Sequence, residues 1–574
     1  MHRSLQTLLL LLTLFVTPYY ADAADNDKDR RLGRQIPNFV LSNTKGKDLA
    51  LADYPEYKLL VFVFLGTECP IGNSYIPDLN TLATKYKSQK VGFVAVNSNL
   101  SDTTADITKH AADYDIQFPV VIDADQIAAD IFGAERTPEA FILDQRRTIR
   151  YAGRIDDRIG YRFKRSKAQR ADLDEAISEL LKGESPTIAS TEVEGCKITR
   201  KYDLIEKGAI TYASHIAKLL QTRCQNCHRP NTAAPFKLLT YDDARNWSEM
   251  IKETVLQRRM PPWNADPRFG DFENDLHMPP KEISMLTAWI DGGMPMGDES
   301  KIPATPEYSD GWQIGKPDHV FEMPREYKVK ANGTVAYQYF VTPTDFKEDV
   351  WVQAAEARPG NWKAVHHIIV YYRPKGSTQF RRLKSLGGFA PGEEPTVLPD
   401  GIGMKLPAGS ELVWQLHYTP TGKPEVDRSQ FAIKFCKEEP KKEAEQDLAI
   451  NTRFRIPPGA DSHKVVASKT VNRESTLLAL MPHMHVRGKS FNYKAIFPDG
   501  RVETLLSVPF YDFNWQHEYR LKTPIKLPAG TVIECEAYFD NSNDNPANPD
   551  PAKWVTWGDQ TWEEMMIGFF TVTR

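Results

Sequence analysis

Short apolar runs alternate with amphipathic stretches over roughly residues 30–190. Four runs are rich in aliphatic and aromatic residues and are bounded by polar residues: LLVFVFL (59–65), VGFVAVNS (91–98), FPVVID (118–123) and AFILD (140–144). Strands that alternate with helical stretches are typical of βαβ units. The pattern therefore predicts an α/β domain with a mainly parallel sheet over residues 30–190.

The pattern becomes helical over residues 200–305. Within 281–293, for example, Ile283, Leu286 and Ile290 recur at helical spacing. Because this segment is only about a hundred residues long, it predicts a small helical domain.

From residue 310 onwards the pattern changes again. Short runs of Val, Ile, Tyr and Phe are separated by turns that contain proline and glycine, at 407–409, 457–459, 498–500 and 528–530. Frequent short strands with such turns are typical of β-sandwiches. The region is long enough for two of them, and a charged stretch near 437–445 suggests the division 310–445 and 446–574. The fold class predicted for the chain is therefore multidomain: α/β, then α, then two jelly-roll-like β-sandwiches.

The first residues predict an export signal over residues 1–23. His2 and Arg3 precede an apolar stretch from Leu8 to Val16, and residues 21–23 offer a cleavage site of small residues. The stretch is shorter than the ~20 residues that span a bilayer, although an uncleaved anchor is the alternative. We expect a bacterial protein that is exported, to the periplasm or the medium, with no membrane span in the mature chain.

Composition narrows the class of protein further. The chain has 574 residues, too many for one hydrophobic core. Its formal net charge is −4, so no basic surface points to nucleic acid as a partner. Its six cysteines are too few for a disulfide scaffold, but two of them form a motif.

That motif is Cys224-Gln225-Asn226-Cys227-His228. Two thiols at this spacing can both bond to the vinyl groups of a haem while the adjacent histidine ligates the iron. Zinc would need further Cys or His residues at suitable spacing, and none follows. The motif therefore predicts covalent haem c held by Cys224, Cys227 and His228. A thioether is expected as the other axial ligand, and Met260 in RRMPPW fits best, with Met278 as the alternative. Residues 200–305 thus resemble a class I cytochrome c.

Histidines gather in three apolar strand contexts of the C-terminal region: His366-His367, His417 and His483-Met484-His485. Side chains two apart on a strand share one face, so His483 and His485 can bind the same ion. His366 and His367 would point to opposite faces of a regular strand and can share an ion only at a bulge or bend. Local hydrogen bonding in a sandwich core is the alternative role for each histidine, but five of thirteen histidines in such contexts favour a metal.

The motifs VHHIIVYY, QLHYTP, HMHVRGK and EEMMIGFF, in this order, resemble the copper type II, ascorbate-dependent monooxygenases, which include peptidylglycine and dopamine monooxygenases. The resemblance implies two coppers. One would be an electron-delivering copper held by His366, His367 and His417, and the other an O₂-binding copper. The ligands implied for the second are His483, His485 and Met565, with Met566 as the alternative. Imidazole suits both copper states, and a thioether favours Cu(I).

One departure from this family concerns the substrate. The family places a substrate-binding arginine two residues before its HxH motif, where this chain has Met481. A peptide carboxylate is therefore not the expected substrate, which stays an unknown small molecule. The segment 511–521 and the loop 539–551 suggest His517 and Asp540 as supporting groups near the metal, with ordinary turn and core roles as the alternative.

Cys69 follows the apolar run 59–65 and begins a predicted helix, and Thr137-Pro138 precedes the run 140–144. A helix N-terminus lowers a thiol pKa, and the proline is expected to be cis and to lie beside the cysteine. These features resemble the thioredoxin-like redoxin family of peroxidases and thiol–disulfide oxidoreductases. The chain departs from the family because Gly72 stands where a CxxC motif has its second cysteine. Cys196 could return to resolve Cys69 instead. A structural bridge or a lone thiol is the alternative, and Cys436 with Cys535 is a further possible bridge.

Together the motifs predict an exported redox fusion. The main hypothesis is a copper monooxygenase that hydroxylates an organic substrate with O₂, reduced by the haem, a donor protein or an ascorbate-like reductant. One alternative is a copper-binding electron-transfer protein without oxygenase activity. The other is a thiol–disulfide oxidoreductase that acts through Cys69.

Overall fold

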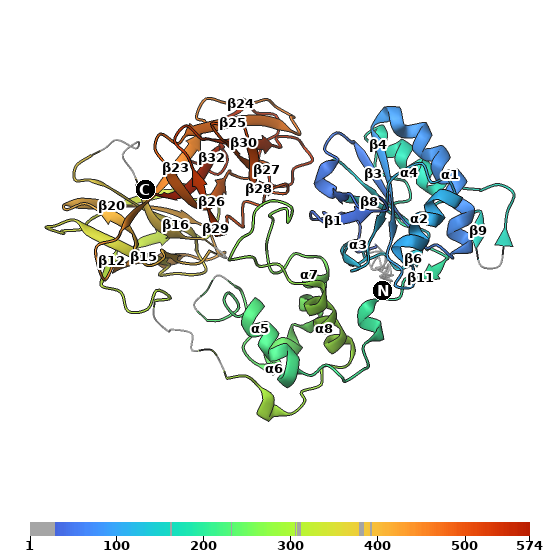
Figure 1. Cartoon of the computed structure of the whole chain (residues 1–574), viewed down its shortest axis with the longest axis horizontal. Helices are drawn as coiled ribbons and strands as arrows, with labels where there is room; N and C mark the ends of the chain where they lie inside the picture. The colour runs from blue at the N-terminus through green and yellow to red at the C-terminus, as the bar shows by residue number, and fades with distance from the viewer. Residues whose placement is uncertain are drawn as a thin grey trace, which may run out of the picture.

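The structure, a computed structural model, describes residues 29–160, 163–230, 232, 234–304, 306, 312–377, 384–390 and 393–574. The predicted export signal lies outside these residues. Figure 1 shows an N-terminal α/β domain (blue), a small helical module (green) and a C-terminal β-region (yellow to red). No helix in the described part of the chain combines the length and the apolarity that a membrane span needs.

The N-terminal domain is built on a sheet in the order β2-β1-β5-β4-β3-β7-β8. Its strands are β1 (Val40–Asn43), β2 (Asp48–Ala50), β3 (Leu59–Phe64), β4 (Val91–Asn97), β5 (Val120–Ile122), β7 (Glu139–Leu143) and β8 (Ile149–Gly153). β3, β4 and β5 are parallel, whereas β7 runs antiparallel to β3 and to β8. The sheet is therefore mixed, and the prediction of a mainly parallel sheet is right only for the centre. The five-residue connection from β7 to β8 is too short for a parallel crossover.

Helices cover both faces of this sheet. They are α1 (Pro70–Tyr86), α2 (Thr104–Asp113), α3 (Ile127–Phe132) and α4 (Asp172–Leu181). Every residue of β3 is buried, because its side chains enter two separate apolar cores, one on each face. Two strand pairs lie beside the sheet: β6 (Arg136–Thr137) with β11 (Cys196–Lys197), and β9 (Ile159–Gly160) with β10 (Phe163–Lys164).

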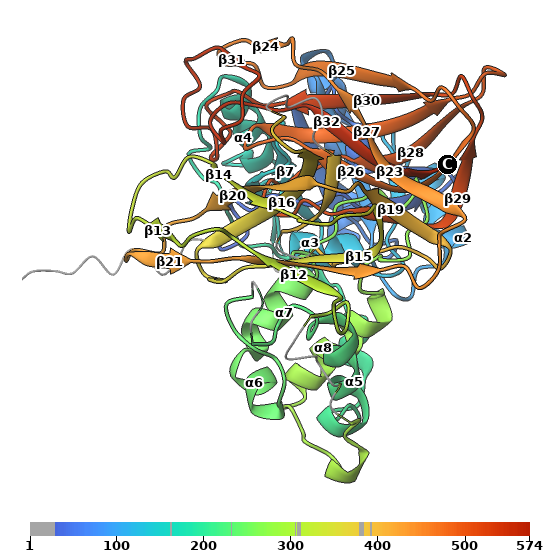
Figure 2. The same ribbon diagram turned by 90° about the vertical axis from the view of Figure 1, so that its left-hand side faces the viewer.

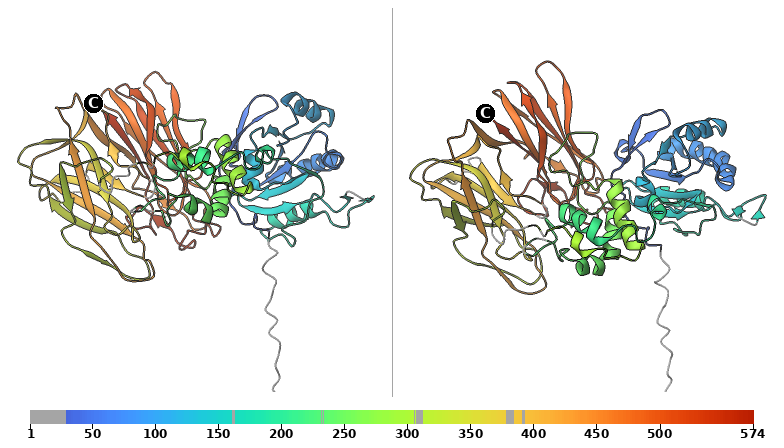
Figure 3. Two further views of the ribbon diagram at one scale, coloured as in Figure 1. Left: turned by 90° about the horizontal axis from the view of Figure 1, so that it is seen from below. Right: turned by 60° about the horizontal axis from the view of Figure 1, so that its bottom comes forward.

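The helical module contains α5 (Ala217–Arg223), α6 (Tyr241–Asn246), α7 (Ser248–Leu256) and α8 (Pro280–Asp291). Its apolar core includes Trp289, Leu286 and Met278. The loop 257–279 between α7 and α8 leaves this core, and its Trp263 and Phe272 are buried in the core of the last β-sandwich. Figure 3 shows the module between the N-terminal domain and the β-region.

Two β-sandwiches make up the C-terminal region. In the first, β12 (His319–Glu322), β22 (Gln430–Phe435), β15 (Val350–Arg358), β18 (Thr396–Val397) and β19 (Ile402–Leu406) pack on β14 (Gln338–Pro343), β20 (Ser410–Tyr418), β16 (Val365–Pro374) and β17 (Lys384–Phe389). In the second, β23 (Lys442–Ile450), β32 (Ile567–Thr573), β26 (Ser475–His483) and β29 (Tyr519–Leu527) pack on β25 (His463–Thr470), β30 (Val532–Phe539), β27 (Gly488–Ile496) and β28 (Val502–Val508). Short pairs join β13 (Tyr327–Val329) to β21 (Glu425–Asp427), and β24 (Arg455–Ile456) to β31 (Val555–Thr556).

One sheet continues from the first sandwich into the second. β19 pairs in parallel with β23, at Ile402 opposite Lys442. The charged stretch that was expected to separate the sandwiches is thus partly the strand that joins them. The predicted turns are present: Gly409, Gly459, Gly500 and Gly530 all have positive φ, which glycine adopts without a Cβ penalty.

Polar contacts connect the N-terminal domain to the rest of the chain. Arg268 of the helical module forms an ion pair with Asp53 at 2.8 Å, and Asn38 donates to Asp266 at 3.2 Å. Arg146 forms an ion pair with Asp540 of the second sandwich. Figure 2 shows the helical module below both the β-region and the N-terminal domain.

Candidate functional site

Cys69 lies at the N-cap of α1, directly after the central strand β3. Its Sγ accepts a hydrogen bond from the Gly72 N–H at 3.4 Å and donates to the Thr137 carbonyl at 3.0 Å. The Thr137–Pro138 peptide bond is cis, as predicted. Cys69 therefore sits where a helix N-terminus meets the segment before β7.

Cys196 lies beside this thiol although it is distant in sequence. Its strand β11 pairs antiparallel with β6, so that Cys196 stands opposite Thr137. Both cysteines are free thiols, Cys69 buried and Cys196 exposed. Cys196 thus lies where it could resolve Cys69, the role that the sequence suggested for it.

The two thiols affect each other's ionisation. Burial by itself would raise the pKa of Cys69, but hydrogen bonds that the sulfur accepts, including those from the Gly72 N–H and from Cys196, outweigh burial and lower the pKa. Burial and the neighbouring Cys69 together raise the pKa of Cys196. The pair thus combines a thiol that ionises more readily, Cys69, with one that stays protonated more strongly than usual, Cys196, an asymmetry that suits disulfide exchange.

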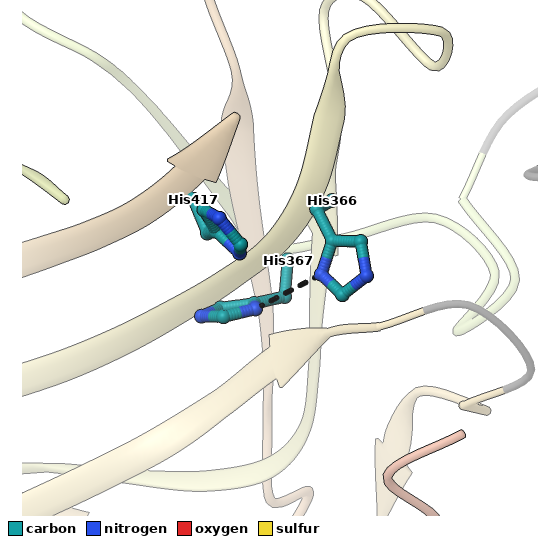
Figure 4. Close-up of side chains that lie close together, drawn as sticks. All are labelled: His366, His367 and His417. Atoms are coloured by element: carbon teal, nitrogen blue, oxygen red, sulfur yellow. Dashed lines mark hydrogen bonds between the residues drawn. The ribbon is translucent and has the colours of Figure 1, made fainter. Parts of the chain in front are cut away.

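Three histidines, His366, His367 and His417, converge in the first sandwich, and we call them the three-histidine group. His367 is directly opposite His417 in the β16–β20 ladder, and the register shifts between Val365 and His367. This irregularity leaves His366 outside the ladder, so the bulge that shared binding required is present. One ligand atom from each side chain lies within 4.8 Å of those from the other two. Figure 4 shows the three rings close together, on neighbouring strands.

Burial keeps this group neutral. It lowers the pKa of His417 to about 3 and also lowers the pKa of His366 and His367. Neighbouring histidines lower the pKa of His417 and His367 further. Nδ1 of His417 is buried without a hydrogen-bond partner. A neutral imidazole with a free nitrogen is the form that ligates a metal.

His483 and His485, which we call the histidine pair, lie at the end of β26 in the second sandwich, with ring centroids 5.4 Å apart. Nδ1 of His483 contacts Oε1 of Gln516 at 2.6 Å, and Nδ1 of His485 contacts the carbonyl of Glu563 at 3.2 Å. These contacts engage Nδ1 of each ring, and Nε2 of His485 is buried without a partner. Burial lowers the pKa of His483 to about 4 and that of His485 to about 3.

The two candidate methionines next to this pair differ in their surroundings. His483 pairs with Ile567 in the β26–β32 ladder, and Met565 lies two residues before Ile567, outside β32, where it is 5% exposed. Met566 is fully buried in the apolar core of the sandwich together with Met484. Met566 is therefore a core residue, whereas Met565 lies outside that core and stays the first candidate ligand.

Tyr337 and Phe513 lie between the two histidine sites. The Tyr337 ring centroid is 5.0 Å from His417 and 6.4 Å from His485. The Phe513 ring stacks on His366 at 5.5 Å and lies 6.0 Å from His485. The sandwiches therefore bring both sites to their mutual interface, separated by aromatic side chains.

Glu564 holds the histidine pair against the segment before β32. Its buried carboxyl group accepts hydrogen bonds from the backbone N–H groups of His485 at 2.8 Å and Arg487 at 2.7 Å. Burial raises the pKa of Glu564 to about 8. Sequence reasoning missed Glu564, Gln516, Tyr337 and Phe513. Three of them, Glu564, Gln516 and Phe513, lie in segments that the sequence analysis singled out, whereas Tyr337 carried no signal.

The two residues suggested as supporting groups have other contacts. His517 is buried, and its ring lies 5.8 Å from Trp263 of the helical module. Its neighbour Gln516, not His517, contacts His483. Asp540 forms an ion pair with Arg146 across the domain boundary. Both residues thus connect parts of the chain.

The CQNCH segment follows α5 in the helical module. Nδ1 of His228 lies 3.0 Å from the Phe236 carbonyl, which orients the ring and leaves Nε2 for another ligand. Cys224 is half-buried against the module core and Cys227 is exposed, both as thiols. Met278 is 4% exposed within this core, whereas Met260 is half-buried in the loop that leaves it.

The predicted bridge between Cys436 and Cys535 is wrong, since both are free thiols. Sγ of Cys436 contacts the Ile402 carbonyl in the first sandwich at 3.8 Å. Cys535 is fully buried in the core of the second. Cys535 therefore fills the core of the second sandwich, whereas Cys436 is half-buried in the first.

Comparison with known proteins concerns the N-terminal domain. The AhpC/TSA family model matches residues 32–152. The thiol-disulfide oxidoreductase ResA of Bacillus anthracis is 30% identical over 129 residues, which are 22% of this chain and 72% of the relative. ResA of Geobacillus thermodenitrificans is 30% identical over 143 residues, 25% of this chain and 80% of the relative.

Among solved structures, a hypothetical protein from Sinorhizobium meliloti is 29% identical over 30% of this chain and 97% of its own, with a TM-score of 0.28. A thiol:disulfide interchange protein DsbE from Chlorobium tepidum is 24% identical over 21% of this chain and 81% of its own, with a TM-score of 0.19. Through the domain that carries Cys69, the chain belongs to the AhpC/TSA family of thioredoxin-like redoxins, with ResA-type thiol-disulfide oxidoreductases among its relatives.

Proposed function

We propose that the N-terminal domain is a thiol–disulfide oxidoreductase whose redox centre is the pair Cys69 and Cys196. The observation that carries this proposal is the pairing of Cys196 with Thr137, directly beside the Cys69 thiol. Most of the ResA-type relatives' length is matched by the segment that holds Cys69. Cys196 would supply the second sulfur that the local sequence lacks.

The surrounding groups support exchange at this pair. The Gly72 N–H and Thr137 hold the sulfur of Cys69 at the N-terminus of α1, where the helix dipole favours a thiolate. A thiolate is both the better nucleophile and the better leaving group in disulfide exchange. Cys69 and Cys196 would therefore alternate between two thiols and one disulfide.

The test is disulfide formation in the full chain. After mild oxidation, alkylation and peptide mapping, we expect a Cys69–Cys196 bond, and exchange activity towards a model disulfide that both Cys69→Ser and Cys196→Ser abolish. Cys436→Ser is the matched control, because this half-buried thiol lies in the first sandwich. Oxidation that leaves both thiols free, or activity that survives Cys69→Ser, would overturn the proposal.

A second candidate function concerns copper in the β-sandwiches, and the three-histidine group is the observation that favours it. The residues fit a metal: the imidazoles are neutral, Nδ1 of His417 and Nε2 of His485 are buried without partners, and one ligand atom from each group member lies within 4.8 Å of the others. His366, His367 and His417 would hold one copper, and His483, His485 and Met565 the other. Copper there would supply O₂-dependent hydroxylation of an unknown organic substrate, with electrons from a donor protein or an ascorbate-like reductant.

In that function the chain's own residues orient the ligands and restrict water. Gln516 and the Glu563 carbonyl fix the rings of the histidine pair, while Phe513 and Tyr337 cover the space between the sites.

Metal analysis of the full chain tests this candidate function. We expect two coppers, one after His366→Ala or His483→Ala, and two after His463→Ala, a control on an outer strand. Binding without O₂ uptake under any reductant would favour the non-oxygenase electron-transfer alternative.

We also propose haem c at Cys224, Cys227 and His228. The fixed ring of His228 and the two uncommitted thiols fit the group, with Met260 or Met278 as the other ligand. A haem c absorption spectrum that Cys224→Ala and Cys227→Ala abolish together would support it. Spectra of Met260→Ala and Met278→Ala would identify the second ligand.

Because haem c is attached outside the cytoplasm, we further propose that the protein is exported. N-terminal sequencing of the mature protein would check this proposal.

A further inference from the structure

The two proposed redox cysteines differ sharply in accessibility. Cys69 is 2% exposed, beneath the strand that carries its partner. Cys196 is exposed, as is the next residue, Lys197. A sulfur on a partner molecule can therefore approach Cys196 directly, whereas the approach to Cys69 is covered.

The covering segment is held firmly. Gly195 passes so close to the Thr137 carbonyl that an added Cβ would lie 2.1 Å from its oxygen. Ile198 is buried in the core of the domain, and Arg200 donates to the Ala129 carbonyl at 3.0 Å. Nε2 of Gln126 donates to the Thr199 carbonyl at 2.8 Å. Contacts on both sides of Cys196 thus keep its strand in place over Cys69.

We infer that Cys196, not the helix cysteine Cys69, is the residue that forms the mixed disulfide with a partner, and that the pair acts as an oxidant of partner dithiols. This inference rests on the proposed exchange at Cys69 and Cys196. It reverses the order that a CxxC motif at a helix N-terminus would impose, where the first cysteine meets the partner and the second resolves.

The reaction balances as two exchange steps. A thiolate of the partner attacks Sγ of Cys196 in the Cys69–Cys196 disulfide. A sulfur–sulfur bond forms between partner and Cys196, the bond to Cys69 breaks, and Cys69 leaves with the electron pair as a thiolate. The second partner thiol loses its proton to solvent and attacks the partner sulfur, which expels Cys196 as a thiolate that takes up a proton. The partner loses two electrons, the cysteine pair gains them, and a low-molecular-weight disulfide restores the pair.

Local chemistry supports this direction. The rate of exchange depends on which sulfur is accessible and on the pKa of the leaving thiol, because a more acidic thiol leaves faster. Here the accessible sulfur belongs to Cys196, and the sulfur whose thiolate is stabilised at the helix N-terminus belongs to Cys69. Attack at Cys196 therefore expels the better leaving group, whereas attack at Cys69 would expel the poorer one.

The experiment uses the oxidised full chain and glutathione as the probe thiol. The reaction is quenched with acid at early times, free thiols are alkylated, and tryptic peptides are mapped. We expect glutathione on Cys196 at least ~10-fold more often than on Cys69, because access decides which sulfur reacts. In Cys69→Ser treated with oxidised glutathione, we expect a stable mixed disulfide on Cys196. In Cys196→Ser, the buried Cys69 should react more slowly.

Two outcomes separate this inference from the function on which it rests. If the pair forms a disulfide but glutathione accumulates on Cys69, the assignment of Cys196 is overturned and the oxidoreductase survives. If no Cys69–Cys196 disulfide forms on oxidation, the proposed function itself fails. Peptide mapping distinguishes both from reaction at the remaining four cysteines.

Discussion

At the scale of single residues, the chemistry of the redoxin domain depends on how the thiols of Cys69 and Cys196 shift each other's pKa. The pKa of Cys196 is raised by burial and then by hydrogen bonding and charge repulsion from Cys69. Both effects of Cys69 require its sulfur.

We predict that Cys69→Ala lowers the pKa of Cys196 towards the ordinary thiol value, because the repelling thiolate is removed. The alkylation rate of exposed Cys196 against pH should then reach half its maximum at a lower pH than in the wild type. Mass spectrometry of the Cys196 peptide measures the rate, with Cys436 in the same samples as an internal control. An unchanged curve would show that the two thiols do not interact.

Asp123 provides a second prediction at this scale. It caps α3 by accepting from the Ala128 and Ala129 N–H groups at 3.1 and 2.9 Å, and it also accepts from Ser98. Burial nevertheless raises its pKa from 3.8 to about 6. A raised carboxyl pKa means that the folded state binds more protons than the unfolded state, so stability is lost as pH rises from about 4 through about 6.

We therefore predict that the advantage of the wild type over Asp123→Asn shrinks by roughly 3 kcal/mol between about pH 4 and pH 7. Hydrogen exchange of α3 peptides, corrected for intrinsic rates, measures the local stability. Asp113→Asn, an exposed change on α2, is the control for the loss of a carboxyl group outside α3. A difference that stays constant with pH would contradict the prediction.

At the scale of elements, one glycine fixes the position of a whole strand. The backbone of Gly195 touches the Thr137–Pro138 segment, and an added Cβ would meet the Thr137 carbonyl at 2.1 Å. Such a contact cannot be relieved by a side-chain rotation, because the obstructing atom belongs to the backbone.

Gly195→Ala should therefore displace β11 from β6 and slow formation of the Cys69–Cys196 disulfide by about tenfold or more, since exchange requires the sulfurs to meet. The rate is measured by timed alkylation after addition of oxidised glutathione. Lys197→Ala, an exposed change in the same strand, should leave the rate unchanged. Normal disulfide formation in Gly195→Ala would show that this strand is not constrained as described.

At the scale of the whole molecule, the loop 257–279 connects the helical module to the second sandwich. Trp263 is 8% exposed and packs on Tyr519 with ring centroids 4.9 Å apart, and Phe272 bridges to Leu521. Two side chains of the helical module, Trp263 and Phe272, thus form part of the core of the second sandwich.

Truncation of this anchor should separate the modules. We predict that Trp263→Ala costs about 3–5 kcal/mol, the usual range for removing a buried tryptophan, and speeds hydrogen exchange in both the loop 257–279 and β29. Trp247→Ala, an exposed tryptophan on the helical module, is the matched control. Exchange that rises only in the loop would show that the sandwich core closes without Trp263.

Much of this architecture could be predicted from local pattern. The apolar runs 59–65 and 91–98 became β3 and β4 nearly residue for residue, because strands buried on both faces read as continuous apolar segments. The helix over 281–293 appears as α8, Pro280–Asp291. The antiparallel half of the first sheet was missed, because apolar pattern does not record strand direction.

The sequence predicted which residues belong to the candidate sites, but not which of them lie close together in the fold. The spacing of the CQNCH and HMH motifs indicates which ligand they could bind. His366 and His367 can share a ligand only at a β-bulge, which the sequence does not predict. Tyr337, between the histidine sites, and Glu564, which ties the histidine pair to the segment before β32, act only through distant neighbours.

The sequence by itself determined the order of modules, the helix-capping cysteine and the candidate ligands, because periodicity and short spacing are properties of neighbouring residues. Only the tertiary structure decided that the strand of Cys196 lies over Cys69. It also decided that a register shift brings three imidazoles close together, and that a loop of the helical module packs in a sandwich core. Each of these features depends on segments that are far apart in the chain. The shape and polarity of the whole surfaces that those segments bury decide which of them pack together.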